Sequence, residues 1–220
     1  MTPLERVYQK FPEQTHFVLD TGVARLIDCQ DAAYATLYLD RLEGILALDR
    51  EAGGVATGYQ LTREAGRHLA AWMSVQNAIR VVDLKTRDTA RYLAEQSLIE
   101  RWLGAVKRLG FAVQDVELAL EIVECARLVV GSGETRRIGI QQFETLFEKV
   151  IESGTESDPK KLSAAIRRAR IASLADPDAE PMLQKTGNPD SGKPIFWLAR
   201  ATPGITGCNT GANPVEKQMR

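Results

Sequence analysis

Proline is missing from most of this sequence of 220 residues, because none occurs between Glu13 and Asp158. A proline costs about 3 kcal/mol inside a helix, so a long interval without it favours helices. Cysteine is scarce, and the three cysteines are too widely spaced for the disulfide framework of a small secreted protein; they are Cys29, Cys125 and Cys208. Neither sign of charge dominates, because the sequence contains 28 Lys and Arg and 29 Asp and Glu. This balance excludes an overall positive field that would attract nucleic acid.

Long apolar runs are also missing. The first residues mix charges with prolines and contain no apolar segment of the kind found in a signal peptide. The longest uncharged run, at 201–215, is too rich in Gly, Asn, Thr and Pro to span a bilayer. We therefore expect a cytoplasmic protein with no membrane and no nucleic-acid partner.

Apolar residues recur at three- and four-residue spacings along much of the chain, which indicates amphipathic helices. Helices are predicted at 13–29, 31–49, 62–82, 88–109, 115–130, 140–151 and 158–175. Local signals mark some ends: Thr62 as an N-cap, Gly110 as a left-handed C-cap, and Pro159 at a helix start. Alternating strand patterns are nearly absent, with one weak candidate at 194–199. The predicted fold class is all-α, an antiparallel multi-helix bundle.

Glycine and proline are concentrated in the last part of the chain. Residues 176–220 contain five glycines and six prolines. This density of helix breakers predicts an irregular or disordered segment. We expect a helical bundle domain at 1–175 and a Gly/Pro-rich tail at 176–220.

One glycine-bearing segment between two predicted helices is a candidate ligand site. It reads GSGETRRIG at 131–139, and its glycines permit positive φ while its backbone N–H groups and arginines could hold an anion such as a carboxylate. It is neither a dinucleotide fingerprint nor a P-loop, because no strand precedes it and no Gly-Lys-Ser/Thr follows. A plain connecting loop is the alternative. The candidate anion site consists of Gly131, Gly133, Thr135, Arg136 and Arg137.

Two further groups could take part in acid–base chemistry. His68 lies one helical turn from Glu64 and could act as a general base, although a histidine at the rim of a helix is the simpler interpretation. Glu121 and Glu124 lie about one turn apart and could form an acid–base pair, or could be solvated surface carboxylates. These patterns lead us to predict no catalytic residue.

The signals for metal and nucleic-acid binding are weaker still. No Cys-x-x-Cys pair is present, so Cys29 and Cys125 could bind a metal only if folding brought them to a histidine; buried free thiols are the alternative. The helix predicted at 158–175 is locally basic, which suits an acidic partner, nucleic acid or a solvated face. Its cations are Lys160, Lys161, Arg167, Arg168 and Arg170. No metal ligand is predicted.

Three stretches resemble one known protein family. They read GVARLIDCQDAAYATLYLDRLEGILALD at 22–49, LTREAGRHLAAWMSVQNAIRVVDLKTRDTAR at 61–91 and ECARLVVGSGETRRIGIQQFETLF at 124–147. Each is similar to part of the C-terminal helical region of the beta subunit of indolepyruvate ferredoxin oxidoreductase, within the 2-oxoacid:ferredoxin oxidoreductase family. The resemblance extends over about residues 19–175 and includes phrases such as LYLDRL and IRVVDLKTR.

This resemblance implies the family's activity, which is the oxidative decarboxylation of aryl 2-oxo acids such as indolepyruvate to acyl-CoA, with reduction of ferredoxin. In the family, thiamine diphosphate and iron–sulfur clusters carry out that chemistry. The α/β domain that precedes the helical region in the family has no counterpart here. We therefore expect a truncated homologue: a helical accessory or assembly part that binds no cofactor itself and packs against a catalytic subunit, which holds the thiamine diphosphate and the clusters.

Three other interpretations stay open. The chain could be a truncated remnant without a function of its own. The chain could be a stand-alone helical module that binds a small anionic ligand near the 131–139 segment. It could also be an independent enzyme with a reactive group around His68.

Overall fold

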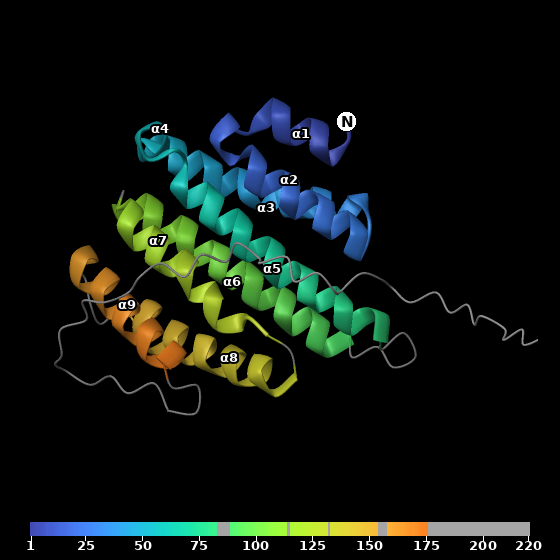
Figure 1. Ribbon diagram of the computed structural model, residues 1–220. Coiled ribbons are helices and arrows are strands. Elements are labelled where there is room, and N and C mark those ends of the chain that lie inside the picture. The colour runs from blue at the N-terminus through green and yellow to red at the C-terminus, as the bar shows by residue number, and fades with distance from the viewer. Residues whose placement is uncertain (83–88, 114, 132, 154–157, 176–220) are drawn as a thin grey trace, which may run out of the picture. The chain divides into compact units, whose positions relative to one another are not determined.

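The computed structural model describes residues 1–82, 89–113, 115–131, 133–153 and 158–175, without the side chains at 75–82, 89–91 and 111–113 (Figure 1). All of these residues belong to the first of the two units into which the chain divides, Met1–Lys185. The tail predicted at 176–220 and the strand candidate at 194–199 lie outside the described residues, so both stay predictions.

Helices make up nearly all of the described residues, among which no strand occurs. The predicted all-α, multi-helix class is therefore confirmed. The elements are α1 (Pro3–Lys10), α2 (Glu13–Cys29), α3 (Ala32–Glu51), α4 (Gly54–Thr57), α5 (Gln60–Val82), α6 (Thr89–Val113), α7 (Val116–Glu124), the 3-10 helix η1 (Cys125–Val129), α8 (Gly133–Leu146), the π-helix η2 (Phe147–Ile151) and α9 (Pro159–Ala175). None of these helices combines the length and the apolar character needed to cross a bilayer.

Several helices begin and end close to the predicted residues. α2 coincides with the predicted 13–29, and α3 lies close to the predicted 31–49. Asp31 caps α3 by accepting a backbone N–H hydrogen bond at 2.8 Å. α9 begins at Pro159, and the carboxylate of Asp158 accepts a backbone N–H hydrogen bond at 3.0 Å. The predicted signal at Pro159 therefore located the start of α9.

Gly110 is not the C-cap that the sequence indicates, because α6 continues past it to Val113. A Cβ atom at Gly110 would overlap the side chain of Leu48 on α3 and lie 3.4 Å from the Cβ of Ala119 on α7. The glycine is thus explained by close helix packing rather than by a turn. The sequence predictions also missed the short helices α1 and α4.

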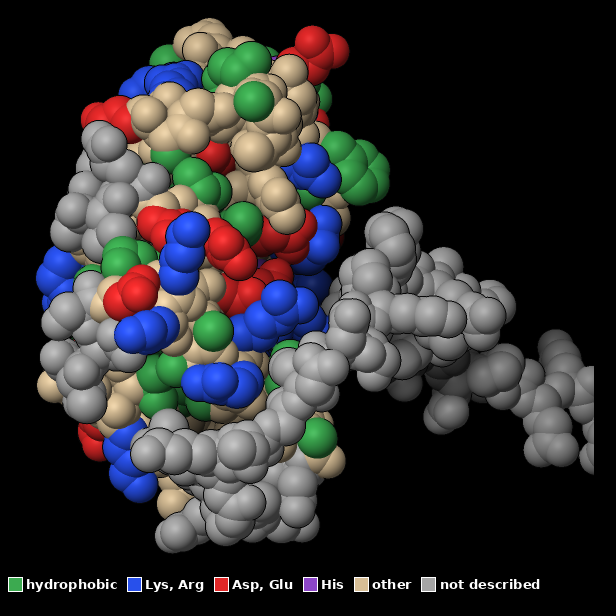
Figure 2. Space-filling model, turned by 90° about the vertical axis from the view of Figure 1, so that its left-hand side faces the viewer, with side chains coloured by type: hydrophobic (Ala, Val, Ile, Leu, Met, Phe, Trp, Pro, Cys, Tyr) green, Lys and Arg blue, Asp and Glu red, His purple; other side chains and the backbone are tan. Residues whose placement is uncertain are grey.

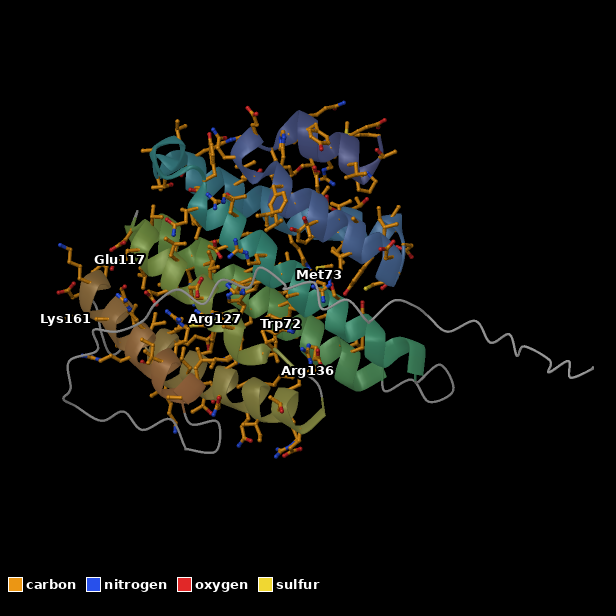
Figure 3. All side chains as sticks on the ribbon, in the orientation of Figure 1. Trp72, Met73, Glu117, Arg127, Arg136 and Lys161 are labelled. Atoms are coloured by element: carbon orange, nitrogen blue, oxygen red, sulfur yellow. The ribbon has the colours of Figure 1, made fainter. Side chains whose placement is uncertain are left out.

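The helices share one core, in which distant segments of the chain lie side by side. α2 packs on α3 and α5, α7 contacts α5, α6 and α9, and α8 contacts η1 and α9 (Figure 1). Aromatic rings join these elements: the ring centroid of Trp72 (labelled in Figure 3) lies 5.8 Å from that of Trp102 and 5.3 Å from that of Phe143, which stacks on Phe147 at 4.3 Å. This buried aromatic group joins α5, α6 and α8, and Trp102 also links α6 to α7 by donating a hydrogen bond to the carbonyl of Ile122 at 2.9 Å.

A buried aspartate connects the end of α3 to the start of α5. Thr62 is not the N-cap that the sequence indicates, since α5 begins at Gln60. Instead, the backbone N–H and the hydroxyl of Thr62 both donate to Oδ2 of Asp49, each at 2.8 Å. Asp49 and Thr62 are fully buried. The carboxylate of Asp49, beside the first turn of α5, also complements the positive end of the helix dipole.

We expect Asp49→Ala to lower the free energy of unfolding by about 2 kcal/mol, because it leaves two buried donors of Thr62 without their acceptor. Urea-induced unfolding followed by circular dichroism measures this loss. Asp31→Ala is the matched control, since it removes an exposed cap and costs about 1 kcal/mol. Equal losses for the two variants would contradict the importance of burial at Asp49.

Candidate functional site

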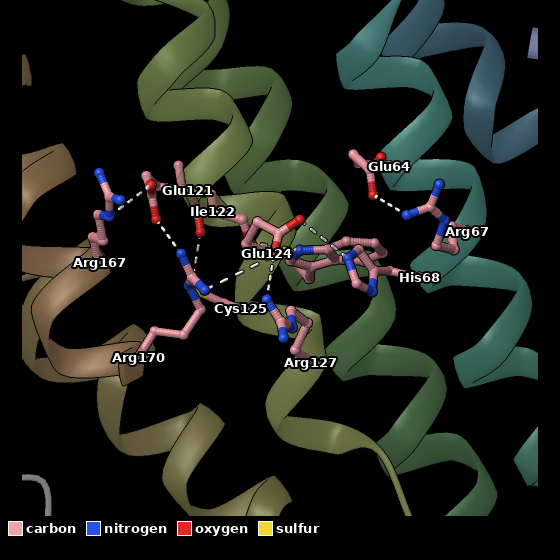
Figure 4. Close-up of polar contacts among 11 residues, drawn as sticks. Glu64, Arg67, His68, Glu121, Ile122, Glu124, Cys125, Arg127, Arg167 and Arg170 are labelled. Atoms are coloured by element: carbon pink, nitrogen blue, oxygen red, sulfur yellow. Dashed lines mark hydrogen bonds and ion pairs between the residues drawn. The ribbon is translucent and has the colours of Figure 1, made fainter. Parts of the chain in front are cut away.

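Charged side chains from four elements gather where α5, α7 and α9 meet, and we call this group the α5–α7–α9 cluster (Figure 4). Its members are Glu64, Arg67 and His68 from α5, Glu121 and Glu124 from α7, Arg127 from η1, and Arg167 and Arg170 from α9. Viewed from the side on which α4, α7 and α9 are labelled in Figure 1, acidic and basic side chains lie intermixed on the molecular surface (Figure 2).

Helical spacing explains why these polar residues share one place at the edge of the core. Glu64 and His68 are four residues apart on α5, beside the buried Ala65 and Leu69. Residues at this spacing lie on one face of a helix, one turn apart. The glutamates of α7 likewise flank its buried face, which carries Ile122 and its neighbours. The apolar faces therefore pack inward and bring the flanking charges together.

Glu124 is the centre of the cluster. Its Oε1 lies 3.4 Å from Nε2 of His68, and its Oε2 lies 3.2 Å from a guanidinium nitrogen of Arg127 and 3.8 Å from one of Arg170. Burial alone would raise the pKa of Glu124, but the hydrogen bond and charge of His68, together with the charges of the arginines, outweigh burial and lower the pKa to about 2. Glu124 therefore stays an anion at neutral pH.

A second glutamate fastens α9 to α7. Arg170 is nearly buried and pairs with Oε2 of Glu121 at 2.5 Å, while Arg167 lies 4.0 Å from the other oxygen. The thiol of Cys125 donates to the backbone carbonyl of Glu121 at 3.2 Å, and burial raises the pKa of this thiol. Cys125 is thus a buried thiol in an environment that disfavours the reactive thiolate.

The structure gives a different set of metal-ligand candidates from the one considered in the sequence. In the described part of the chain, the grouping of three His, Cys, Asp or Glu side chains whose ligand atoms come within 4.8 Å of one another is Glu64, His68 and Glu124. Cys125 and Cys29 are not part of it. Folding therefore brings His68 to carboxylates rather than to cysteines.

The candidate anion site is largely helical instead of forming a loop. Gly131 and Gly133 have positive φ, 114° and 58°, as the sequence suggested they could. However, α8 begins at Gly133 and not at 140, so the residues that follow form its first turns. Arg136 is fully buried, donates to the carbonyl of Val129 at 2.8 Å and pairs with the carboxylate of Glu95 at 2.6 Å (Figure 3). An anionic ligand would have to displace Glu95 from Arg136.

The two other members of the candidate anion site lie in the first two turns of α8. Thr135 packs its methyl group near Gly131, where an added Cβ would lie 3.2 Å away. Arg137 is exposed and pairs with Glu134 on its own helix at 2.5 Å. The structure therefore separates the two arginines, one inside the protein and one on its surface, and anion binding here stays a prediction.

The basic helix at 158–175 is similarly divided by its orientation. Arg170 faces inward to Glu121, whereas the other cations are exposed: Lys160, Lys161, Arg167 and Arg168. Its spacing, four residues after Ile166, places Arg170 on the apolar face of α9 and Arg168 off that face, whereas the pairing with Glu121 depends on how α9 packs against α7. The partners Glu95 and Arg127 were missed for the same reason.

Comparisons with known proteins give one family match. The model of a family of unknown function (DUF6537) matches residues 15–91 and 87–149, which together span more than half of the chain. The matched residues include His68, Glu121, Glu124 and Arg127, and they end before α9. No curated protein and no solved structure matches the sequence.

Proposed function

The chain belongs to the DUF6537 family, whose function is unknown, and we propose that it is the helical accessory part of an indolepyruvate-type 2-oxoacid oxidoreductase. In this proposal the chain supports assembly, and a catalytic partner subunit performs the oxidative decarboxylation of aryl 2-oxo acids to acyl-CoA with reduction of ferredoxin. We place this complex in the cytoplasm.

The observation that carries the proposal is that the three stretches of resemblance form helices that pack on one another. The stretch at 22–49 forms the second half of α2 and most of α3, and the described part of 61–91 forms most of α5 and the start of α6. The stretch at 124–147 forms η1 and α8. α2, α3 and α5 contact one another, and η1 contacts both α5 and α8. The resemblance thus concerns the residues that build the core, which supports a shared helical fold.

The chain's cysteines are too few to hold an iron–sulfur cluster of that reaction on their own. A cubane or rhombic iron–sulfur cluster needs four ligands, usually cysteine thiolates, whereas this chain has three cysteines in all. One of these, Cys125, is buried with its thiol bonded to a backbone carbonyl. In the proposal, thiamine diphosphate and the clusters are therefore bound by the partner, and no reaction step is assigned to this chain.

Co-purification tests the proposal. The full chain, carrying an affinity tag, is expected to recover from its source a subunit that contains thiamine diphosphate and iron–sulfur clusters, identified by mass spectrometry and absorbance. Added to that isolated subunit, the chain should raise the rate of indolepyruvate-dependent ferredoxin reduction. The chain alone, supplied with indolepyruvate, coenzyme A and ferredoxin, should show no turnover.

Two neighbouring arginines provide matched variants for this experiment. Arg136→Ala removes a buried ion pair, whereas Arg137→Ala removes an exposed one. If a folded helical surface binds the partner, recovery of the partner at 37 °C should fall for Arg136→Ala and stay unchanged for Arg137→Ala. Repeated recovery of the wild-type chain alone, or turnover by the chain alone, would overturn the proposal.

A further inference from the structure

We propose that Glu64, His68 and Glu124 bind a divalent transition-metal ion of the zinc class. Their ligand atoms all lie within 4.8 Å of one another (Figure 4). Oε1 of Glu124 and Nε2 of His68 are 3.4 Å apart. Two ligands at the roughly 2.0–2.1 Å bond lengths of a tetrahedral zinc site are about 3.3–3.4 Å apart. These two atoms are thus already at the separation that such an ion requires.

Glu64 completes the set by a small movement of its side chain. It lies one turn before His68 on α5, so both side chains project from the same face of a rigid helix. Its ion pair is with Arg67 on that same helix and uses Oε2, at 3.0 Å, so Glu64 can turn Oε1 toward the ion while this pair is kept. Because Glu124 is on α7, which packs on α5, the ion would join two helices that are already in contact.

Arginines hold the outer oxygens of both carboxylates. Arg67 lies 3.0 Å from Oε2 of Glu64, and Arg127 lies 3.2 Å from Oε2 of Glu124. Each carboxylate therefore has one oxygen fixed by an arginine and another to offer to an ion. Hydrogen bonds of this kind from a surrounding shell orient metal ligands in known sites.

Charge and ligand type together limit which ion binds and how tightly. Two carboxylates balance the charge of a divalent ion, but the adjacent arginines offset part of this negative charge, so we expect micromolar rather than nanomolar affinity. An imidazole nitrogen suits Zn²⁺, Co²⁺, Ni²⁺ and Cu²⁺, whereas Mg²⁺ and Ca²⁺ prefer oxygen ligands alone. The site should therefore discriminate strongly between Zn²⁺ and Mg²⁺. This inference does not depend on the proposed role in an oxidoreductase.

The competing explanation is a purely structural arrangement, in which His68 pairs with Glu124 and Glu64 pairs with Arg67. Thermal unfolding of the full chain, freed of any affinity tag and treated with a chelator, separates the two. We expect 1 mM Zn²⁺ to raise the melting temperature by about 5 °C and 1 mM Mg²⁺ by less than about 1 °C. Equilibrium dialysis with metal analysis should recover one Zn²⁺ per chain from this site.

Substitutions then assign the binding to these residues. Glu64→Gln and His68→Gln should each weaken Zn²⁺ binding at least about tenfold and so clearly reduce the rise in melting temperature. His16→Ala is the matched control, because His16 is the other histidine of the chain. It lies on α2 and bonds to the carbonyl of Phe11, away from the proposed site. This variant should keep the full rise in melting temperature with Zn²⁺. Glu64 is partly exposed, and its ion pair is with Arg67 on the same helix, so we expect Glu64→Gln to fold. This variant therefore tests the proposal even if His68→Gln fails to fold. No Zn²⁺ binding by the wild type, or equal binding by Glu64→Gln, shows that the proposal is wrong.

Discussion

Arg136→Ala should lower the free energy of unfolding by about 3–5 kcal/mol, the largest loss that we expect from a single side chain of this protein. Arg136 is fully buried, and its guanidinium pairs with the nearly buried carboxylate of Glu95 at 2.6 Å and donates to the carbonyl of Val129 at 2.8 Å. Alanine would leave the charge of Glu95 in a poorly solvated position without this guanidinium. It would also leave a cavity at the contact of α6 with α8.

Chemical denaturation of three variants separates charge from packing. Arg137→Ala, one residue away, removes an exposed pair between neighbours on α8 and should change the free energy of unfolding by less than about 1 kcal/mol. The double variant Glu95→Leu/Arg136→Met should recover most of the loss, because a buried pair can be replaced by apolar side chains of similar volume. If Arg136→Ala costs no more than Arg137→Ala, the buried pair does not stabilise this fold.

Gly139→Ala is expected to lower the free energy of unfolding by about 3 kcal/mol, although alanine is the better helix former. A Cβ atom at Gly139 would overlap the backbone carbonyl oxygen of Leu128 and lie 3.1 Å from its carbonyl carbon. These atoms belong to the backbone of η1, which packs directly on α8. Because backbone cannot move aside as a side chain can, the two elements would have to separate.

Gly104→Ala is the control for this prediction. Gly104 is an exposed position inside α6, and a Cβ there would have no atom within 4 Å in the described structure. Since alanine favours helix by about 1 kcal/mol over glycine, Gly104→Ala should raise the melting temperature. Gly139→Ala should lower it, as differential scanning calorimetry can measure. A change of the same sign in both variants would contradict the close approach of α8 and η1.

Both substitutions, Arg136→Ala and Gly139→Ala, fall in the segment at 131–139. From its sequence, this segment is predicted to be a glycine-bearing loop with two arginines. Its composition correctly indicates positive φ at Gly131 and Gly133. It does not reveal that a helix begins at Gly133, nor that Gly139 serves helix packing rather than flexibility. Glycine has the same identity whether it permits a turn or permits a close contact, so the sequence does not separate the two roles.

The α5–α7–α9 cluster shows a similar limit. The i, i+4 spacing of Glu64 and His68 predicts that they share a face of one helix. The meeting of His68 with Glu124, 56 positions further along the chain, depends on how α5 packs against α7. No feature of either local sequence indicates that contact, so the metal-ligand set proposed for this protein could be found only in three dimensions.

The all-α class and the approximate positions of the longer helices were determined by the amino-acid sequence alone, because apolar periodicity and proline act over a few neighbouring positions. The tertiary structure alone decided which helices pair and which charged side chains meet between them. Arg136 and Arg137 are adjacent and chemically identical, yet one is fully buried beside Glu95 and the other is exposed beside Glu134. The physical reason is that burial depends on which helix face meets a neighbour, and that neighbour is distant in the sequence.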